Sequence, residues 1–468
     1  MSRIKHLKQG EADFSFTLPL VIIGGGACGL VAALAAVDQG IDCVVLERDR
    51  FPRGSTFMSS GFIPAAGTRF QQEKNVKDSP EIMAEDIMAK NKHEADPAIV
   101  HALAAQSGRV IEWLADRHNI PFELVEGFLY PGHSRLRMHC TPRRTGEELM
   151  ACLLRAVEDA GIAVMCDAHV TTLHVDADEN ICGVTYNRPD GQAEQIGCQS
   201  LLLACNGFGG NPDLVSKFIP AMTDGLYYGH EGNQGDAILW GDALGAGLKD
   251  LHAYQGHGSL ATPHQILISW AAMMQGGIQV NIEGIRFSNE NLGYSEQAAK
   301  VIAQPDAIAW NIYDARIHED LMKFEDYRNA FQAGAVKMFN TLESMASGLN
   351  MPIEALQDSF ADMDSHMTSG MPDKFGRTFD KELKLEAPYY AIKVTGALFH
   401  TQGGLAIRPD GRVLKDNEQP FKNLFAAGGA ARGVSGSNDS GYLSGNGLLS
   451  AVVMGEIAGS AASQLILK

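Results

Sequence analysis

The pattern in this sequence best suited to chemistry is a glycine turn followed, at a fixed distance, by an acid. Gly24, Gly26 and Gly29 form a Gly-x-Gly-x-x-Gly pattern, and Glu47 stands 23 residues after Gly24. The first glycine permits a tight turn, the second lets the backbone approach a pyrophosphate, and the third lets a helix pack close to the sheet. A carboxylate about 20 residues further on can hold ribose hydroxyls. The sequence therefore predicts a dinucleotide site.

The segments around this turn supply the elements that such a site needs. Leu20–Ile23 is a short apolar run, as expected for a buried parallel strand. Residues 30–40 are rich in alanine and predict a helix, whose N-terminus favours a phosphate charge. Cys43–Leu46 predicts a second strand that ends at Glu47. These elements support a nucleotide fold but leave NAD and FAD open.

The far end of the sequence favours the longer cofactor. Residues 423–427 predict a last buried strand before Gly428 and Gly429, and Gly445-Asn446-Gly447 opens a helix of small residues. A nucleotide fold that begins near residue 20 and closes near residue 446 encloses a long cofactor. The positive end of the closing helix would lie near a flavin pyrimidine ring, where it stabilises the anionic reduced form.

Composition narrows the class of protein. The 468 residues correspond to about three domain-equivalents, and 45% hydrophobic with 20% charged residues is an ordinary globular composition. The net charge of −18 argues against a nucleic-acid partner. None of the eight cysteines forms a CxxC pair, so we expect reduced thiols in a cytoplasmic protein.

One uncharged stretch, Leu18–Val37, is long enough to cross a membrane. Its four glycines would break a spanning helix near the middle, and a strand, a turn and a helix explain the same residues better. We therefore expect no transmembrane segment.

The middle of the chain shows two further patterns. Residues 164–175 and 181–186 alternate apolar and polar side chains around a turn, which predicts a hairpin-like small sheet. Residues 318–370 are rich in Met and charge, with helical spacing and no strand pattern, which predicts a helical part of a second domain. The histidines show no metal-ligand spacing, so no metal site is expected.

Nearly the whole chain resembles the fumarate reductase/succinate dehydrogenase flavoprotein superfamily, and most of all its 3-ketosteroid dehydrogenases of the Δ4-(5α) branch. The motifs that carry the resemblance are the glycine turn, the loop Gly54 to Gly61, the segment Leu203 to Asn211, Gly235-Asp236-Ala237, Gly284-Ile285-Arg286-Phe287-x-Asn289-Glu290, His400-Thr401-Gln402-Gly403-Gly404 and the final glycine block. The resemblance implies an α/β fold. A Rossmann-like FAD-binding domain (residues 1–253 and 396–468) would carry an inserted α+β capping domain for the substrate (residues 254–395).

By the same resemblance the cofactor is FAD. Together with the residues of the glycine turn, the expected contacts are Gly24, Gly26, Gly29, Glu47, Arg48, Ser55, Thr56, Ser60, Gly61, Val170, Ala204, Gly207, Gly428, Gly445, Asn446 and Leu448. Covalent relatives attach the flavin to a His near residue 60, where this chain has Met58-Ser59-Ser60-Gly61, so non-covalent FAD is expected. Many relatives carry Glu where this chain has Gly429, so that ribityl contact is lost or replaced.

Most of the cationic clamp that holds a dicarboxylate in fumarate reductases is missing by this comparison. One Arg normally follows the Arg-Phe-x-Asn-Glu motif, where this chain has Tyr294, and a second lies in the final glycine block, where this chain has Asp439 and no Arg. An expected Glu is replaced around Ser269-Trp270, and His257 and His400 are the parts that remain. Unpaired buried carboxylates would cost several kcal/mol.

Tyr294 and Tyr442-x-Ser444 are instead what the ketosteroid dehydrogenases carry. A proton next to a ketone becomes removable when the carbonyl oxygen receives hydrogen bonds as enolate charge develops. A phenol needs a polarised site and a relay before it can act as the base. The expected catalytic residues are therefore Tyr294, Tyr442, Ser444 and His400, in an FAD-dependent dehydrogenase that introduces a C=C bond beside a ketone and passes electrons to an external acceptor.

Three alternatives stay open at this point. In the first, the chemistry runs in reverse as reduction of an activated alkene, with His400 or Tyr294 as the acid. In the second, the protein is a flavin-binding subunit or redox sensor that uses Cys205. In the third, the substrate is a small oxocyclohexane acid, with the stretch His133 to His139 either holding its carboxylate or forming a solvated loop.

Overall fold

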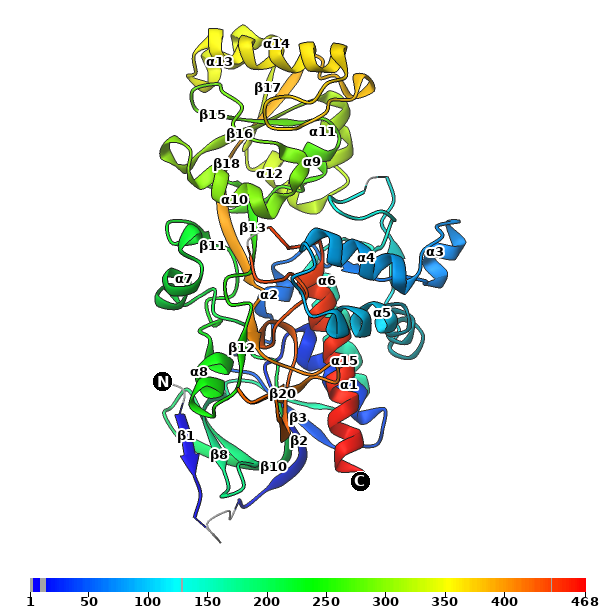
Figure 1. The fold of residues 1–468 in the computed structure, drawn as a ribbon, viewed down its shortest axis with the longest axis vertical. Coiled ribbons are helices and arrows are strands. Elements are labelled where there is room, and N and C mark those ends of the chain that lie inside the picture. Colours follow the sequence, from blue (N-terminus) through cyan, green and yellow to red (C-terminus); the bar gives the residue numbers. More distant parts are fainter. Residues whose placement is uncertain (1–2, 9–13, 128, 439) are drawn as a thin grey trace.

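The computed structural model describes residues 3–8, 14–127, 129–438 and 440–468, and it has two main sheets that lie in different halves of the molecule (Figure 1). Asp439 of the final glycine block lies outside the described residues. The nucleotide fold occupies the lower half of this view, together with both ends of the chain, and the second sheet lies above it (Figure 1). The combination confirms the predicted α/β fold with a capping domain.

The first sheet has nine strands, and parallel pairing runs through its centre. The parallel strands are β2 (Thr17–Ile23), β3 (Cys43–Leu46), β7 (Ala163–Met165), β10 (Ala193–Leu203) and β21 (Pro420–Ala426). At one edge β1 (Arg3–His6) also pairs in parallel with β8 (His169–Val175), whereas β9 (Ile181–Asn187) and β20 (Arg412–Leu414) pair antiparallel with their neighbours. The predicted hairpin is confirmed as β8–β9, which continues into β10 as part of this sheet, but residues 164 and 165 belong to β7, which pairs with β3 instead.

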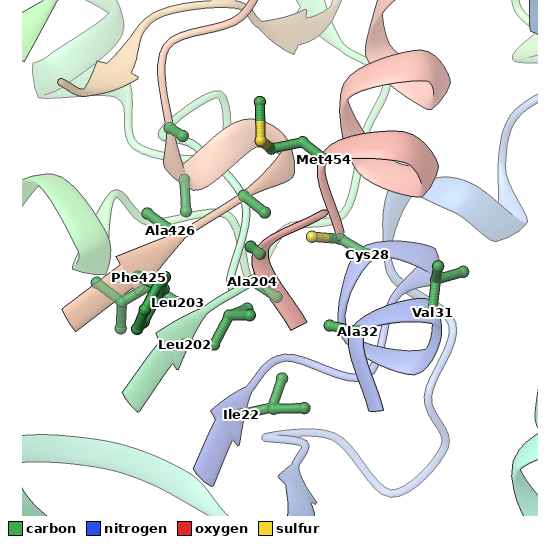
Figure 2. Close-up of a cluster of buried hydrophobic side chains, with 14 of the residues drawn as sticks. Ile22, Cys28, Val31, Ala32, Leu202, Leu203, Ala204, Phe425, Ala426 and Met454 are labelled. Atoms are coloured by element: carbon green, nitrogen blue, oxygen red, sulfur yellow. The ribbon is translucent and has the colours of Figure 1, made fainter. Parts of the chain in front are cut away.

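The core of this half lies between the sheet and two helices, α1 (Ala27–Val37) and α15 (Asn446–Ile466). Figure 2 shows Cys28 of α1 near Met454 of α15, with Ala32 further along α1 and strand residues such as Leu203 and Phe425 to the left of the helices. A Cβ at Gly459 would lie 2.4 Å from the Ala32 carbonyl oxygen. The two helices can therefore approach only because this position is glycine.

The uncharged stretch Leu18–Val37 is divided between β2, the glycine turn and α1, as the sequence predicts. Within the described part of the chain, one helix, α15, is long and apolar enough to cross a membrane, with a mean hydropathy of 1.3. Because 61% of that window is buried inside the protein and the helix packs along α1, it has the character of a core helix.

The second sheet has seven strands around a long central one, β18 (Tyr389–Thr401). Its other strands are β11 (Leu226–Tyr227), β13 (Tyr254–Ala261), β14 (Ile266–Leu267), β15 (Ile278–Asn281), β16 (Ala309–Asp314) and β17 (Val336–Phe339). The helices of this half are α9 (Ala271–Met274), α10 (Tyr294–Ile302), α11 (Ala315–Leu321), α12 (Glu325–Gln332), α13 (Leu342–Leu349) and α14 (Ile353–Ser369). Two strands of this sheet extend beyond the limits 254–395 predicted for the capping domain, since β18 continues past residue 395 and β11 lies before residue 254. These domain limits stay a prediction.

The expectation of a strand-free segment over residues 318–370 is wrong at β17, which pairs with β18. This strand has four residues, and Met338 within it is exposed. Its two end residues are half-buried and the two residues between them are exposed, so the strand lacks the alternation of buried and exposed side chains that predicts a strand from sequence.

The remaining helices and strands complete the fold. They are α2 (Gly54–Phe57), α3 (Arg69–Glu73), α4 (Pro80–Lys90), α5 (Pro97–His118), α6 (Gly146–Asp159), α7 (Pro212–Phe218), α8 (Asp236–Ala243), β4 (Ile63–Pro64), β5 (Glu123–Leu124), β6 (Met138–Cys140), β12 (Leu248–Lys249) and β19 (Gly404–Leu405).

Candidate active site

A long cavity joins the nucleotide fold to the capping sheet. Its free space, counted out to the open mouth, is about 1670 Å³. The glycine turn and Glu47 line the cavity at the nucleotide end, and Tyr294 and Tyr442 line it beside the second sheet. The residues predicted for a cofactor and for catalysis therefore share one cavity.

The glycine turn has the geometry of a phosphate cradle. Gly24 has φ +111°, and a Cβ there would lie 2.5 Å from the Ala204 carbonyl oxygen. A Cβ at Gly26 would meet only Thr56 Oγ1, at 3.9 Å, so its bare face adjoins free space. Gly26 has no side chain to cap α1, and of the first helical N–H groups that of Ala27 has a long hydrogen bond to Thr56 Oγ1 (3.4 Å), so this helix start can donate to an anion.

Glu47 closes the nucleotide end. Its carboxylate accepts hydrogen bonds from the N–H groups of Gly25 (2.7 Å) and Asp49 (2.9 Å). Burial raises the pKa of Glu47, whereas these two N–H groups lower it. The hydrogen bonds hold the carboxylate at the cavity wall, with lone pairs left for ribose hydroxyls.

The loop at residues 54–61 is held by a neighbouring segment. Ser55 Oγ accepts hydrogen bonds from Asn233 Nδ2 (2.9 Å) and from the His230 N–H (3.2 Å). Gly61 has φ +71°, and a Cβ there would lie 2.8 Å from the Thr145 carbonyl oxygen. The backbone of this loop is thereby fixed along the middle of the cavity.

Gly429 stands where many relatives have Glu, and the structure shows what fills that place. A Cβ at Gly429 would lie 2.1 Å from Asn206 Oδ1 and 2.8 Å from His400 Nε2. Asn206 has φ +63° and lines the cavity. The Asn206 side chain therefore occupies the space that a side chain at position 429 would need.

Glycines position the aromatic residues beside the second sheet. Tyr294 is the first residue of α10, which packs on β13 and β18. A Cβ at Gly256 would lie 2.6 Å from Ala298 Cβ, one at Gly258 2.8 Å from Gln297 Cβ, and one at Gly396 2.2 Å from the Ala298 carbonyl oxygen. These three glycines let the helix approach, so that the His257 ring stacks on the Tyr294 ring.

A cluster of hydroxyl groups adjoins that aromatic stack. Burial raises the pKa of Tyr294 well above its usual 10, Tyr442 raises it further, and a hydrogen bond with Ser444 lowers it. Burial raises the pKa of Tyr442 to about 12, although the Gly447 N–H, the Tyr294 hydroxyl and the Gly445 N–H all lower it. The Gly447 N–H lies 3.5 Å from the Tyr442 oxygen. Of the two phenols, Tyr442 is therefore the one whose anion the site favours.

Two histidines line the same region, and both are neutral. Burial lowers the pKa of His257 to about 3 and that of His400 to about 4. His257 Nδ1 accepts a hydrogen bond from the Ser259 N–H (3.1 Å), so its proton sits on Nε2. His400 Nδ1 lies 2.8 Å from the side-chain nitrogen of Gln402. Each ring can then offer Nε2–H as a donor without carrying charge.

The cavity lining holds little positive charge. Among the described residues that line it, Arg48 is the only Arg or Lys, and it lies next to Glu47 at the nucleotide end, where it donates to the Gly232 carbonyl oxygen (2.8 Å). Ser269 and Trp270 line the region where a relative's Glu was expected. A dicarboxylate beside Tyr294 would therefore meet no Arg or Lys among the described residues there.

The Arg-Phe-x-Asn-Glu motif instead builds the inside of the cap. Arg286 pairs with Glu290 (2.9 Å) and Asp373 (2.8 Å), and Arg377 pairs with Glu290 (2.8 Å). Burial raises the pKa of Glu290, but the two arginines outweigh it and bring that pKa down to about 2. The Glu290 carbonyl accepts a hydrogen bond from Trp270 Nε1 (3.1 Å), which links this network to the cavity wall.

In the stretch His133 to His139, Ser134 and Arg135 are exposed, whereas the other cation, Arg137, is not presented to a substrate. Arg137 is buried, and its guanidinium pairs with Asp78 and Asp86. His133 Nε2 hydrogen-bonds the Ser444 carbonyl oxygen (2.9 Å). The stretch therefore does not form the carboxylate site considered above. It supports the Tyr442–Ser444 loop through the hydrogen bond from His133.

The model of the FAD-binding-domain family matches residues 20–448. The chain belongs to this family. It is 29% identical over 466 residues to a probable fumarate reductase of Shewanella frigidimarina, covering 98% of this chain and 77% of the relative. It is 25% identical over 472 residues to a urocanate reductase of Eggerthella lenta, covering 99% and 77%.

Solved structures agree with this assignment. The flavoprotein matches the open conformation of a flavocytochrome c3 fumarate reductase with a TM-score of 0.81 and 28% identity, over 98% of this chain and 80% of that one. It matches the 3-ketosteroid-Δ4-(5α)-dehydrogenase of Rhodococcus jostii with a TM-score of 0.76 and 23% identity, over 98% and 99%, a likeness of fold. The flavoprotein is therefore an FAD-dependent oxidoreductase of the fumarate reductase superfamily.

The bare face of Gly26, the uncapped start of α1 and the Glu47 carboxylate fit FAD. Thirteen of the sixteen expected FAD contacts line the cavity, namely Gly24, Gly26, Glu47, Arg48, Ser55, Thr56, Ser60, Gly61, Val170, Ala204, Gly428, Gly445 and Leu448. Gly29 instead packs α1 on the turn, since its Cβ would lie 1.9 Å from the Gly24 carbonyl oxygen. Gly207 packs against Thr401, and the Asn446 side chain points to Ser435.

All four expected catalytic residues of the flavoprotein, Tyr294, Tyr442, Ser444 and His400, line the cavity. Sequence reasoning did not place Asn206, Gly447 or Tyr130 there, and it did not count His257 among the catalytic residues, although His257 lines the cavity. The glycines on either side of His257 were the available signal, because a buried histidine between two glycines needs close packing on both sides.

Proposed function

We propose that this flavoprotein is an FAD-dependent dehydrogenase that introduces a C=C bond beside the ketone of an alicyclic substrate, either a 3-ketosteroid or a smaller oxocyclohexane-type ring. The observation that carries the proposal is the cluster of Tyr294, Tyr442 and Ser444 in a region of the cavity whose described lining has no Arg or Lys. Neutral hydroxyl groups suit a ketone, whereas a dicarboxylate needs cations.

Tyr442 is the group that takes the proton from the carbon beside the ketone. Three donors face its oxygen, from Gly447, Tyr294 and Gly445, and each stabilises the phenolate. Tyr294 in turn interacts with the Ser444 side chain, which gives a line of hydroxyl groups along which a proton can leave. Bound FAD supplies the acceptor for the hydride.

The ketone oxygen needs hydrogen-bond donors that strengthen as it becomes an enolate. His400 offers a neutral imidazole N–H for this purpose, and His257 a second. Phe62, Trp270 and Phe399 line the same region, so a flat apolar ring has surfaces to contact.

The anaerobic test mixes the purified yellow protein with saturated 3-ketosteroids and oxocyclohexane acids and follows the absorbance of oxidised flavin. Bleaching by one of these ketones is the expected result. No bleaching by any of them, combined with reoxidation of the dithionite-reduced protein by fumarate, would contradict the proposal.

The second candidate is a reductase of an activated alkene. It is favoured by the fumarate reductases among the relatives at 27–29% identity and by His257 and His400, the two histidines that line the cavity beside the second sheet. An enone that reoxidises the reduced protein in the absence of any ketone-dependent bleaching would support this candidate.

Three narrower expectations belong to the same proposal. Met58, Ser59 and Ser60 offer no histidine for a covalent bond, so acid precipitation should release FAD into the supernatant. Electrons pass to an external acceptor, which dye reduction would measure. A cytoplasmic location stays a prediction, which cell fractionation would test.

A redox-sensor role for Cys205 is disfavoured because burial raises the pKa of this thiol and so disfavours the reactive thiolate.

A further inference from the structure

A line of hydrogen bonds runs from the start of α15 to His400. Asn446 Nδ2 donates to Ser435 Oγ (3.2 Å), and Ser435 Oγ donates to Gln402 Oε1 (2.9 Å). Gln402 Nε2 then lies 2.8 Å from His400 Nδ1. Asn446, Ser435 and Gln402 are all buried, and none of them lines the cavity.

We propose that Asn446, Ser435 and Gln402 are positioning residues that hold His400 in the tautomer with its proton on Nε2, so that this nitrogen donates a hydrogen bond to the substrate oxygen. The inference rests on the proposed function in one respect, that His400 faces the substrate. The tautomer itself is independent of which substrate binds.

The direction of the line decides what His400 can do. An amide N–H can only donate, so the order Asn446, Ser435, Gln402 delivers a donor to Nδ1 and leaves the proton on Nε2. The reverse order would place Gln402 Oε1 at the ring, require Nδ1–H and turn Nε2 into an acceptor. The two orders therefore predict opposite tautomers.

Two observations favour the order in which Asn446 is the first donor. Asn446 is the first residue of α15, and its Nδ2, which can only donate, faces Ser435 Oγ, whereas its Oδ1 is buried with no hydrogen-bond partner among the described residues. The other histidine beside the second sheet, His257, has the same tautomer by an unambiguous donor, the Ser259 backbone N–H. Both rings then present Nε2–H.

The backbone of Gln402 is also fixed. Its N–H donates to the Ala253 carbonyl oxygen (2.8 Å), and its carbonyl accepts from the Gly433 N–H (2.8 Å). The side chain thus starts from a rigid point between the two halves of the chain, and Ser435 fixes its other end. A neutral donor held this firmly costs little reorganisation when charge develops on a substrate oxygen.

The direct test is the ¹⁵N spectrum of histidine-labelled, FAD-loaded protein, with the His400 signals assigned by their loss in His400→Asn. We expect a protonated Nε2 and an unprotonated Nδ1 in the natural protein, and a mixture of tautomers in Gln402→Leu. Protonated Nδ1 in the natural protein would overturn the proposal whatever the substrate, and would leave the proposed dehydrogenase activity standing.

A kinetic test uses Gln402→Glu, which keeps the size but presents only acceptors to Nδ1. With the ketone that bleaches the flavin, we expect kcat to fall about 100-fold while KM changes little, as for loss of one transition-state donor. Gln402→Glu with natural kcat and a protonated Nδ1 would overturn the role of the tautomer.

Ser435→Ala and Ser450→Ala form a matched pair. Both serines are buried, but Ser450 Oγ has no hydrogen-bond partner among the described residues and stands outside the line. Ser435→Ala should produce mixed tautomers, whereas Ser450→Ala should leave the His400 spectrum unchanged. Equal spectra for the two variants would contradict the proposal.

Discussion

The His257 ring stacks on the Tyr294 ring, with centroids 4.7 Å apart and an angle of 22° between the planes. On its other side, His257 stacks on Phe399 at 5.2 Å. This sandwich joins β13, β18 and α10 at the cavity wall, so the direction of Tyr294 depends on how closely α10 approaches the sheet.

Gly258→Ala should disturb this arrangement. Its new Cβ would lie 2.8 Å from Gln297 Cβ and 3.0 Å from the Gln297 carbonyl carbon, so α10 must shift. We expect a loss of about 1–3 kcal/mol in the free energy of unfolding and a turnover lowered about 10-fold or more, with FAD still bound. Thermal unfolding and ketone-dependent dye reduction measure the two effects. If Gly258→Ala turns over as fast as the unsubstituted protein, the position of α10 does not control catalysis.

Tyr442→Phe should lower turnover by about 100-fold or more while FAD stays bound, because it removes the proton acceptor. Tyr186→Phe is the control, since Tyr186 hydrogen-bonds Glu194 and lies outside the cavity lining. Stopped-flow flavin reduction compares the two variants. A near-normal rate in Tyr442→Phe would remove Tyr442 from the mechanism.

The rate of flavin reduction should rise with pH. The pKa of Tyr442 is raised to about 12, so its phenolate is scarce at neutral pH and its population grows about tenfold per pH unit below that value. His400 and His257 stay neutral over this range because their pKa values are lowered to about 4 and 3. Rates measured between neutral and alkaline pH that fall as the pH rises would contradict a phenolate base.

Asn206 and Gly429 should behave as a pair. Gly429→Glu alone has no space beside Asn206 Oδ1 and should release FAD, whereas adding Asn206→Gly removes this closest clash and leaves only the His400 ring, 2.8 Å from the new Cβ, to shift. We expect the double variant to bind FAD at least tenfold more tightly than Gly429→Glu. Equal dissociation constants, measured by titration of the apoprotein with FAD, would show that the two positions do not compete.

Acid should destabilise the cap through Glu290. Its pKa falls from 4.5 to about 2 in the folded protein because Arg286 and Arg377 outweigh burial. The stability contributed by the charged form is therefore complete above pH 4.5 and is lost as the pH falls from 4.5 towards 2. Glu290→Gln should flatten this part of the Tm–pH curve and lower Tm at neutral pH, since it leaves buried arginines without their anion. If the Tm of Glu290→Gln falls in acid as steeply as that of the unsubstituted protein, groups other than Glu290 cause the acid destabilisation.

Local patterns were sufficient to predict the nucleotide end. The strand, glycine turn, helix, strand and acid are contiguous from Leu20 to Glu47, and each position is constrained by a backbone need that the residue types display. The presence of Tyr294, Tyr442, Ser444 and His400 in one cavity also followed from their motifs. Asn446 was expected to contact FAD, but its side chain does not line the cavity, because it hydrogen-bonds Ser435 instead.

The sequence by itself determined the family of fold, the nucleotide motif and the hydroxyl-bearing residues, because those signals lie within short segments. Only the tertiary structure decided that Asn206 fills the space beside Gly429, that Arg137 is paired with Asp78 and Asp86, and that a line of amides reaches His400. These relations join residues distant in sequence, and they depend on close approach and burial, which no local pattern of residue types encodes.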